Sequence, residues 1–292
     1  MVDLHVSDEE LIKLYNNIQS KVKVDLDRKN ETLLNDLLKS QSILSNIQFK
    51  GLNPECEAVL HVNHLLKQAI KEEKPVSHFL NYSCFDESVL KTALYSVLID
   101  IRDNEITAEI DPNKLLFKAN ILLPELINNI LTEDIMNIRS QSKDTGVPFE
   151  ILSMIGGLLI QPGMRLLGET CSKTLLDAWD LTPCPICGRI PSVVIKPETD
   201  AWTFSCSFCG IRYKMDIFTC PHCRSEGSEN KEFHIVGENL EYEIAECKEC
   251  KHYFKIINIA RLQQIIPNGF EDSSTRVLDE IAIGYGLLRI DE

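Results

Sequence analysis

Four Cys-x-x-Cys pairs fall within 67 consecutive residues, and their residue types and spacing could hold metal. The pairs are Cys184 with Cys187, Cys206 with Cys209, Cys220 with Cys223, and Cys247 with Cys250. In such a pair two thiolates converge on one ion, and a second pair completes a tetrahedral shell of four sulfurs suited to zinc or to a single iron. The eight cysteines therefore predict two metal ions, each zinc or iron, in a four-cysteine site.

The segments between the pairs indicate which pairs share an ion. The first two pairs enclose 18 residues and the last two enclose 23, with 10 residues between the units, so an interleaved pairing remains possible on spacing alone. Residues 192–196 and 201–205 are rich in β-branched and aromatic residues, which predicts a hairpin that returns the chain to the first knuckle. Residues 232–236 and 241–245 repeat this plan. We therefore expect the first pair to join the second, and the third pair to join the fourth.

Other interpretations of the cysteine pairs are a disulfide framework and a thioredoxin-like redox motif. The N-terminus is acidic and lacks an apolar run, so it does not resemble a secretory signal, and paired Cys-x-x-Cys spacing in an intracellular chain indicates metal. A thioredoxin-like motif would need one pair near a βαβ pattern. Because closed shells of four thiolates have no open coordination position, we expect the metal to act mainly as a structural element.

The residues before Cys184 carry helical periodicity. Apolar residues recur at helical spacing over 7–18, 33–47, 56–70, 88–101, 113–138 and 149–179. Pro124 and Pro162 are expected to break or kink the last two helices. Six or seven such helices would pack as a bundle. The longest uncharged stretch, 151–164, is too short to cross a bilayer, so we expect a buried core helix and no membrane insertion.

The charge distribution argues against a nucleic-acid-binding role. The formal net charge is −14, and residues 184–260 carry 9 basic against 11 acidic side chains. Affinity for nucleic acid comes mainly from basic contacts to phosphates. Lys248, Lys251 and Lys255 could form a local basic face, although a solvated strand face is the simpler interpretation.

The remaining titratable and thiol side chains give weaker signals. His61 and His64 lie three apart on an expected helix and could face a metal together, but ordinary histidines fit as well. His222 and His252 lie in or beside a knuckle and are expected to tune or shield the site. Cys84 and Cys171 fit apolar helix faces as small buried side chains. The sequence shows no catalytic motif, which predicts that the protein is not an enzyme.

The knuckles and their flanks resemble the formate dehydrogenase accessory proteins of the FdhE family. The resemblance rests on residues 184–191, 206–213, 220–223 and 246–255, with weaker similarity at 149–176 and 277–285. Lys251 departs from the pattern, since glycine is common there. The family consists of cytoplasmic, non-catalytic assembly factors that bind the catalytic subunit of formate dehydrogenase, a molybdenum or tungsten pterin enzyme, and that carry two rubredoxin-like folds able to bind iron.

What the resemblance implies is an assembly factor whose two metal modules form a binding platform and, with iron bound, a redox sensor. Gly188 and Gly210 would allow N–H···S bonds at the first site, which makes it the better redox candidate. Trp202, Phe204, Tyr213 and Phe218 could screen that site. A zinc-ribbon protein that binds nucleic acid and a rubredoxin-like electron-transfer protein are the alternatives.

These observations predict an α+β chain. A helical bundle at 1–180 would be followed by rubredoxin-like, or zinc-ribbon, modules at 181–218 and 219–260 and by a C-terminal helical tail at 261–292. The linker 180–183 is so short that it should hold the helical domain close to the first module and form a cleft between them.

Overall fold

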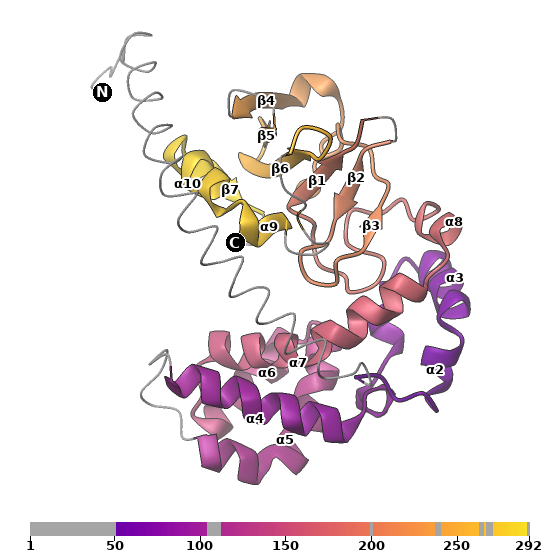
Figure 1. Ribbon diagram of the computed structural model, residues 1–292, viewed down its shortest axis with the longest axis vertical. Coiled ribbons are helices and arrows are strands. Elements are labelled where there is room, and N and C mark those ends of the chain that lie inside the picture. Colours follow the sequence, from indigo (N-terminus) through magenta and orange to yellow (C-terminus); the bar gives the residue numbers. More distant parts are fainter. Residues whose placement is uncertain are drawn as a thin grey trace.

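The computed structural model of the 292-residue chain describes residues 51–103, 112–198, 201–236, 241–262, 266 and 271–290. The predicted helices at 7–18 and 33–47 lie outside these residues. Helices come first, most of a sheet follows, and two helices and a last short strand close the described chain (Figure 1). The predicted α+β class is therefore confirmed.

The helical part consists of α-helices and two short 3-10 helices. They are α2 (Glu57–Leu60), α3 (Val62–Glu72), η1 (Val76–Phe79), η2 (Tyr82–Cys84), α4 (Glu87–Asp103), α5 (Pro112–Leu131), α6 (Ile135–Thr145), α7 (Phe149–Thr170) and α8 (Lys173–Leu176). α7 packs against α4, α5 and α6 and supplies the centre of this domain. Its buried face includes Leu152, Ile155, Leu159 and Met164.

The two prolines do not end their helices, which corrects part of the prediction. Pro124 lies inside α5 and Pro162 inside α7. An interior proline costs about 3 kcal/mol, but burial of side chains such as Leu123 and Ile127 contributes about 1.5–3 kcal/mol each and outweighs that cost. The predicted helix 113–138 divides instead before Asp134, whose side chain accepts a hydrogen bond from Asn137 N and caps α6.

α7 is long enough to cross a membrane by length and composition, with 22 residues and a mean hydropathy of 1.3 in its most apolar window. The 14-residue uncharged stretch lies inside this longer helix, so its length alone did not exclude a membrane span. However, 56% of that window is buried inside the protein. This burial agrees with the prediction of a core helix.

Within the described residues, seven strands form one sheet. They are β1 (Val193–Lys196), β2 (Thr203–Ser205), β3 (Arg212–Tyr213), β4 (Lys231–Val236), β5 (Tyr242–Cys247), β6 (His252–Asn258) and β7 (Leu288–Arg289). A 3-10 helix, η3 (Ser228–Asn230), precedes β4. The order is β3-β2-β1-β6-β5-β4, with β7 paired to β6. The predicted hairpins are present as the antiparallel pairs β1–β2 and β4–β5.

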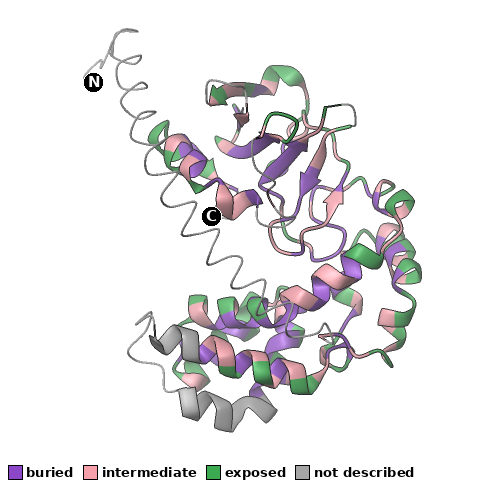
Figure 2. Ribbon diagram, in the orientation of Figure 1, coloured by how far each residue is buried: buried purple, intermediate pink, exposed green. Residues whose placement is uncertain are grey.

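The parallel pairing of β1 with β6 joins the strands of the two metal modules. Val193 pairs with Lys255 and Lys196 with Asn258. Both strands are largely buried, as the purple ribbon at the middle of the sheet shows (Figure 2). The two knuckle units therefore share one continuous sheet, and the division at 218/219 stays a prediction.

The helical domain and the first module share a single apolar core. Met164 and Leu167 of α7 belong to the same buried cluster as Phe204 of β2. The backbone also connects the two parts, because Val76 N and Ser77 N donate to the carbonyls of Pro185 and Ile186 at 2.9 and 2.8 Å. The first module is thereby fixed against the helices.

The C-terminal segment covers the sheet through a buried ionic network. It contains α9 (Glu271–Ser274) and α10 (Arg276–Gly284). Lys255 Nζ of β6 lies 2.7 Å from Asp272 and 3.0 Å from Asp279, and Arg289 pairs with both carboxylates. Lys255 is 0% exposed, so the prediction of a solvated or basic face containing it is wrong. The pattern could not show that two carboxylates from residues 272–279 meet this lysine.

Candidate metal centres

The four knuckles have the same backbone geometry. In each one, the N–H of the residue after the second cysteine donates to the carbonyl of the first cysteine, at 2.8–2.9 Å. The donors are Gly188, Gly210, Arg224 and Lys251, and their φ angles are 79°, 70°, 61° and 62°. All four residues thus adopt the left-handed conformation that glycine favours. The lack of glycine in the second module does not change the turn, although a left-handed non-glycine residue costs roughly 1–2 kcal/mol.

The first cluster contains Cys184, Cys187, Cys206 and Cys209 and is enclosed by protein. The Sγ atoms of Cys184 and Cys209 lie 3.5 Å apart, and those of Cys187 and Cys206 lie 3.4 Å apart. None of the four residues is more than 7% exposed. A tetrahedral shell with metal–sulfur bonds of about 2.3 Å has edges of about 3.8 Å, so the sulfurs stand nearly as far apart as such a shell requires.

The second cluster contains Cys220, Cys223, Cys247 and Cys250 and is more open to solvent. The Sγ atoms are 3.7 Å apart both for Cys220 with Cys250 and for Cys223 with Cys247. Cys223 is exposed and Cys250 is half-buried. These sulfur distances match the edge of about 3.8 Å expected for a four-thiolate shell.

The clustered thiols differ in their acid–base properties. Burial raises the pKa of Cys184 and of Cys209 well above the usual value, whereas hydrogen bonds from the neighbouring thiols hold the pKa of Cys206 well below it. At the second cluster, burial raises the pKa of Cys247, but hydrogen bonds from Ser225 and from backbone N–H groups outweigh burial and lower the pKa to about 6. Zinc or iron bound here would hold the thiolates together and release their protons.

The structure gathers the sulfurs in sequential order. The first pair meets the second and the third meets the fourth, and the ligating atoms of each group lie within 4.8 Å of one another. The chain thus contains two four-cysteine clusters that could hold metal ions. That all eight cysteines ligate metal stays a prediction.

The aromatic residues expected to screen the first centre take different positions. Phe204 and Tyr213 are 0% exposed, and the Tyr213 hydroxyl donates to the carbonyl of Thr182 at 2.9 Å. Burial, and after it the charge of the first-cluster cysteines, raises the pKa of Tyr213. Phe218 is 37% exposed and meets Phe233 of the second module edge to face. Phe204 and Tyr213 fit the screening role, and Phe218 does not.

His222 and His252 lie beside the second cluster as a stacked pair. Their ring centroids are 3.5 Å apart, and a ring nitrogen of His252 lies 2.9 Å from the Cys250 carbonyl. Burial, and next the charge of His252, lowers the pKa of His222. A ring nitrogen of each histidine and the Cys250 sulfur also lie within 4.8 Å of one another, so the predicted shielding role stays a prediction. Within the described residues, His61 and His64 join no group of metal-ligating side chains.

A further group, Glu232, His234 and Glu246, could not be recognised from sequence spacing. Its ligating atoms also lie within 4.8 Å of one another. Glu246 already pairs with Lys251 at 2.7 Å and with His234 at 3.1 Å. These partners satisfy that carboxylate. The pairing also accounts for Lys251, which the sequence placed on a possible basic face.

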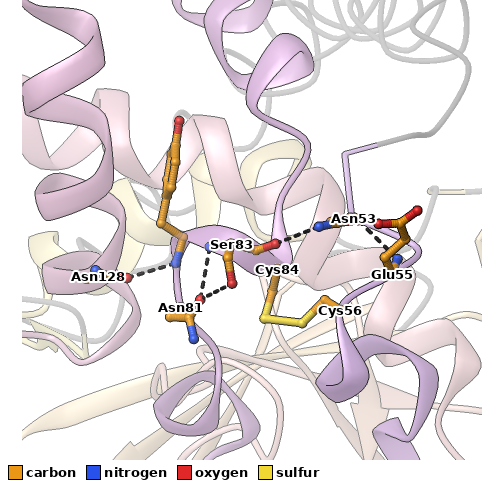
Figure 3. The surroundings of a disulfide bond; sticks show 8 residues. Asn53, Glu55, Cys56, Asn81, Ser83, Cys84 and Asn128 are labelled. Atoms are coloured by element: carbon orange, nitrogen blue, oxygen red, sulfur yellow. Dashed lines mark hydrogen bonds between the residues drawn. A yellow bond between two sulfur atoms is a disulfide. The ribbon is translucent and has the colours of Figure 1, made fainter.

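Cys84 is buried, as predicted, but it lies in the short 3-10 helix η2 and forms a disulfide with Cys56 that was not predicted (Figure 3). The Asn53 amide donates to the Ser83 carbonyl at 3.0 Å, and Asn53 N donates to the Cys84 carbonyl at 2.9 Å. These bonds bring together segments that are 28 residues apart. Sequence spacing gave no signal for this contact. Cys171 is half-buried at the end of α7, and burial raises its pKa to about 12.

The fold and its two clusters define a class of protein in which a helical domain carries tandem four-cysteine modules on a shared sheet. No protein-family model matches the chain. The chain is 24% identical over 171 residues to the Protein FdhE homolog of Aquifex aeolicus, a match that covers 57% of the chain and 60% of that protein.

The fold is also similar to the crystal structure of the FdhE protein from Pseudomonas aeruginosa. The TM-score is 0.52 at 17% sequence identity, and the match covers 85% of the chain and 82% of that protein. The resemblance to the FdhE family that the knuckles indicated is therefore confirmed, and the fold is that of FdhE.

Proposed function

We propose that this protein is a cytoplasmic, non-catalytic assembly factor that binds the catalytic subunit of a formate dehydrogenase during its maturation. The observation that carries the proposal is the conjunction of an FdhE fold over 85% of the chain with two four-cysteine clusters at the tips of the paired knuckles. In this proposal, zinc or iron in each cluster makes the modules rigid, and the modules with the adjoining helices form the binding platform.

The charges of the second module support binding to protein over binding to nucleic acid. Lys255 is buried between two carboxylates, and Lys251 pairs with Glu246. Of the three lysines that could have formed a basic face, only Lys248 is exposed without an ion pair among the described residues. A single cation supplies little of the phosphate contact on which nucleic-acid affinity depends.

Closed shells support a non-catalytic role for the metals. Four thiolates occupy every position of a tetrahedral ion, so neither centre would offer an open position to a substrate. Iron in such a shell would add one-electron chemistry without binding a substrate. A role in sensing the redox state of the maturing enzyme is compatible with that chemistry.

Deletion of the gene tests the proposal. We expect formate dehydrogenase activity to fall without a fall in the transcript of its catalytic subunit. A plasmid copy of the gene should restore activity, and so should the Cys171→Ser variant, because Cys171 lies outside both clusters. Cys206→Ser should fail to restore it.

A pull-down identifies the partner directly. The tagged, metal-loaded protein should recover the catalytic subunit from the native cell. Full enzyme activity in the deletion strain, together with capture of nucleic acid by the purified protein in moderate salt, would contradict the proposal and favour the zinc-ribbon alternative.

A further inference from the structure

A cleft of about 280 Å³ lies between α7 and the tips of the first-module knuckles. One wall is the exposed side of α7, with Ser153, Met154, Leu158 and Gln161. The other wall is formed by residues of both knuckles and by α9. Figure 1 shows α7 beside the loops of the first module. The short linker predicted such a cleft, and the structure identifies its lining.

Arg189 is the cationic residue that lines this cleft. Its guanidinium carbon lies 4.0 Å from the centroid of the Phe208 ring, and the residue is exposed. A Cβ placed on Gly157 would lie only 3.4 Å from Arg189 Nη2, so the guanidinium lies over the backbone of α7. No carboxylate among the described residues pairs with it. An arginine held flat in this way presents a preorganised fork that matches a carboxylate.

The surroundings of Arg189 combine apolar surface with unused hydrogen-bonding capacity. Met154 is 39% exposed and Leu158 is 43% exposed, and both line the cleft. The Ser153 hydroxyl is buried without a hydrogen-bond partner in the described part of the chain. Asp272 also lines the cleft, but Lys255 and Arg289 compensate its charge. Among the described residues that line it, the cleft therefore offers one cation without a carboxylate partner, Arg189, beside an apolar strip, within a chain of net charge −14.

We propose that this cleft binds a segment of the partner protein in which an acidic side chain lies next to an apolar one. Arg189 receives the carboxylate, and Met154 and Leu158 cover the apolar side chain. The volume is slightly below the range of roughly 300–1,000 Å³ typical of small-molecule pockets, which suits individual side chains. The proposal rests on the proposed function for the identity of the partner, and only for that.

The first metal centre builds one wall of the cleft. Ser207 and Phe208 lie between Cys206 and Cys209, and Arg189 follows Cys187 by two positions. Gln161 of α7 donates to the Phe208 carbonyl at 2.9 Å, which fixes the knuckle against the helix. Loss of the first metal should therefore remove the wall and release the partner, whereas loss of the second metal should leave the cleft in place.

Two substitutions of arginine test the role of the cation. Purified catalytic subunit is the probe, and its affinity for the immobilised, metal-loaded full chain is measured. Arg189→Met should weaken binding on the order of tenfold to a hundredfold, the effect of losing hydrogen bonds to a charged group. Arg139→Met is the matched control, because Arg139 also stacks on an aromatic ring, Phe149, but lies outside the cleft. Equal affinity of Arg189→Met and wild type would overturn the proposal and leave the proposed function intact.

Photo-crosslinking in the native cell locates the occupant and separates the two proposals. A benzoylphenylalanine at position 158 should form a crosslink to a segment with adjacent acidic and apolar residues, and Arg189→Met should abolish it. Such a crosslink on a protein other than formate dehydrogenase would support the cleft and contradict the proposed partner. Failure to crosslink, or a crosslink to a second copy of this chain, would overturn the cleft proposal.

Discussion

Replacing Cys206 with serine should loosen more of the protein than replacing Cys223, although each change removes one thiol from a four-cysteine cluster. Cys206 is 1% exposed and belongs to the apolar core that continues from α7 into the first module. Cys223 is exposed and lies outside that core. Serine is close to cysteine in size but cannot supply a thiolate, so both variants test the metal and not the packing volume.

The magnitude follows from two free energies. A structural metal contributes about 10–16 kcal/mol to small zinc modules, and a whole domain is stable by only about 5–15 kcal/mol. An emptied first centre leaves buried sulfurs without a cation, so residues 181–218 should unfold. Ile211, just after the second knuckle, approaches Gly168 closely. The C-terminal half of α7 should therefore lose its cover and become less stable.

Amide hydrogen exchange followed by mass spectrometry measures this effect, with the metal content determined on the same samples. Cys206→Ser should speed exchange in 181–218 and in the last turns of α7, whereas Cys223→Ser should do so only around 219–236 and 241–250. Cys171→Ser is the control, because this cysteine is at the end of α7 and belongs to neither cluster. Unchanged exchange at 181–218 in Cys206→Ser protein that has lost metal would refute the reasoning.

Three other outcomes are expected. With excess chelator, metal should leave in two phases, and the faster phase should come from the second cluster because Cys223 is exposed. Cys223→Ser should remove the faster phase, and a single phase in the wild type would contradict the prediction. Lys255→Met should lower the free energy of unfolding in urea by about 1.5–3 kcal/mol, because Asp272 and Asp279 lose the contacts with this buried ammonium and keep only Arg289 as a cation. Lys248→Met should change it by less than about 0.5 kcal/mol. Reduction of the Cys56–Cys84 bond should lower the free energy of unfolding by about 3–4 kcal/mol, given its 28-residue separation. Reductant should therefore lower the melting temperature of the wild type and leave that of a double serine variant unchanged.

The knuckles and their sequential arrangement could be predicted because both depend on local sequence. A Cys-x-x-Cys turn is closed by a hydrogen bond within five residues, and each hairpin joins neighbouring strands. The core position of α7 also followed from its uncharged apolar stretch, whereas the closing helix was expected from the resemblance to the FdhE family. Such features need no knowledge of distant segments, so composition and spacing were sufficient.

The features that the sequence did not show all depend on contacts between distant residues. The β1–β6 pairing joins residues about 60 positions apart, and the burial of Lys255 requires carboxylates supplied by 272–279. The disulfide depends on a bridge between Leu52 and Phe85 that brings its two segments together.

The two clusters have the same donor set but different positions in the fold, and this difference separates their roles. The first is enclosed, shares the core of the helical domain and forms a wall of the Arg189 cleft. The second is partly exposed beside the stacked histidines. Exclusion of solvent is one of the factors that set the potential of an iron centre. In the proposed function, the first centre would therefore link its own state to partner binding, while the second would hold the knuckles from which β4, β5 and β6 extend.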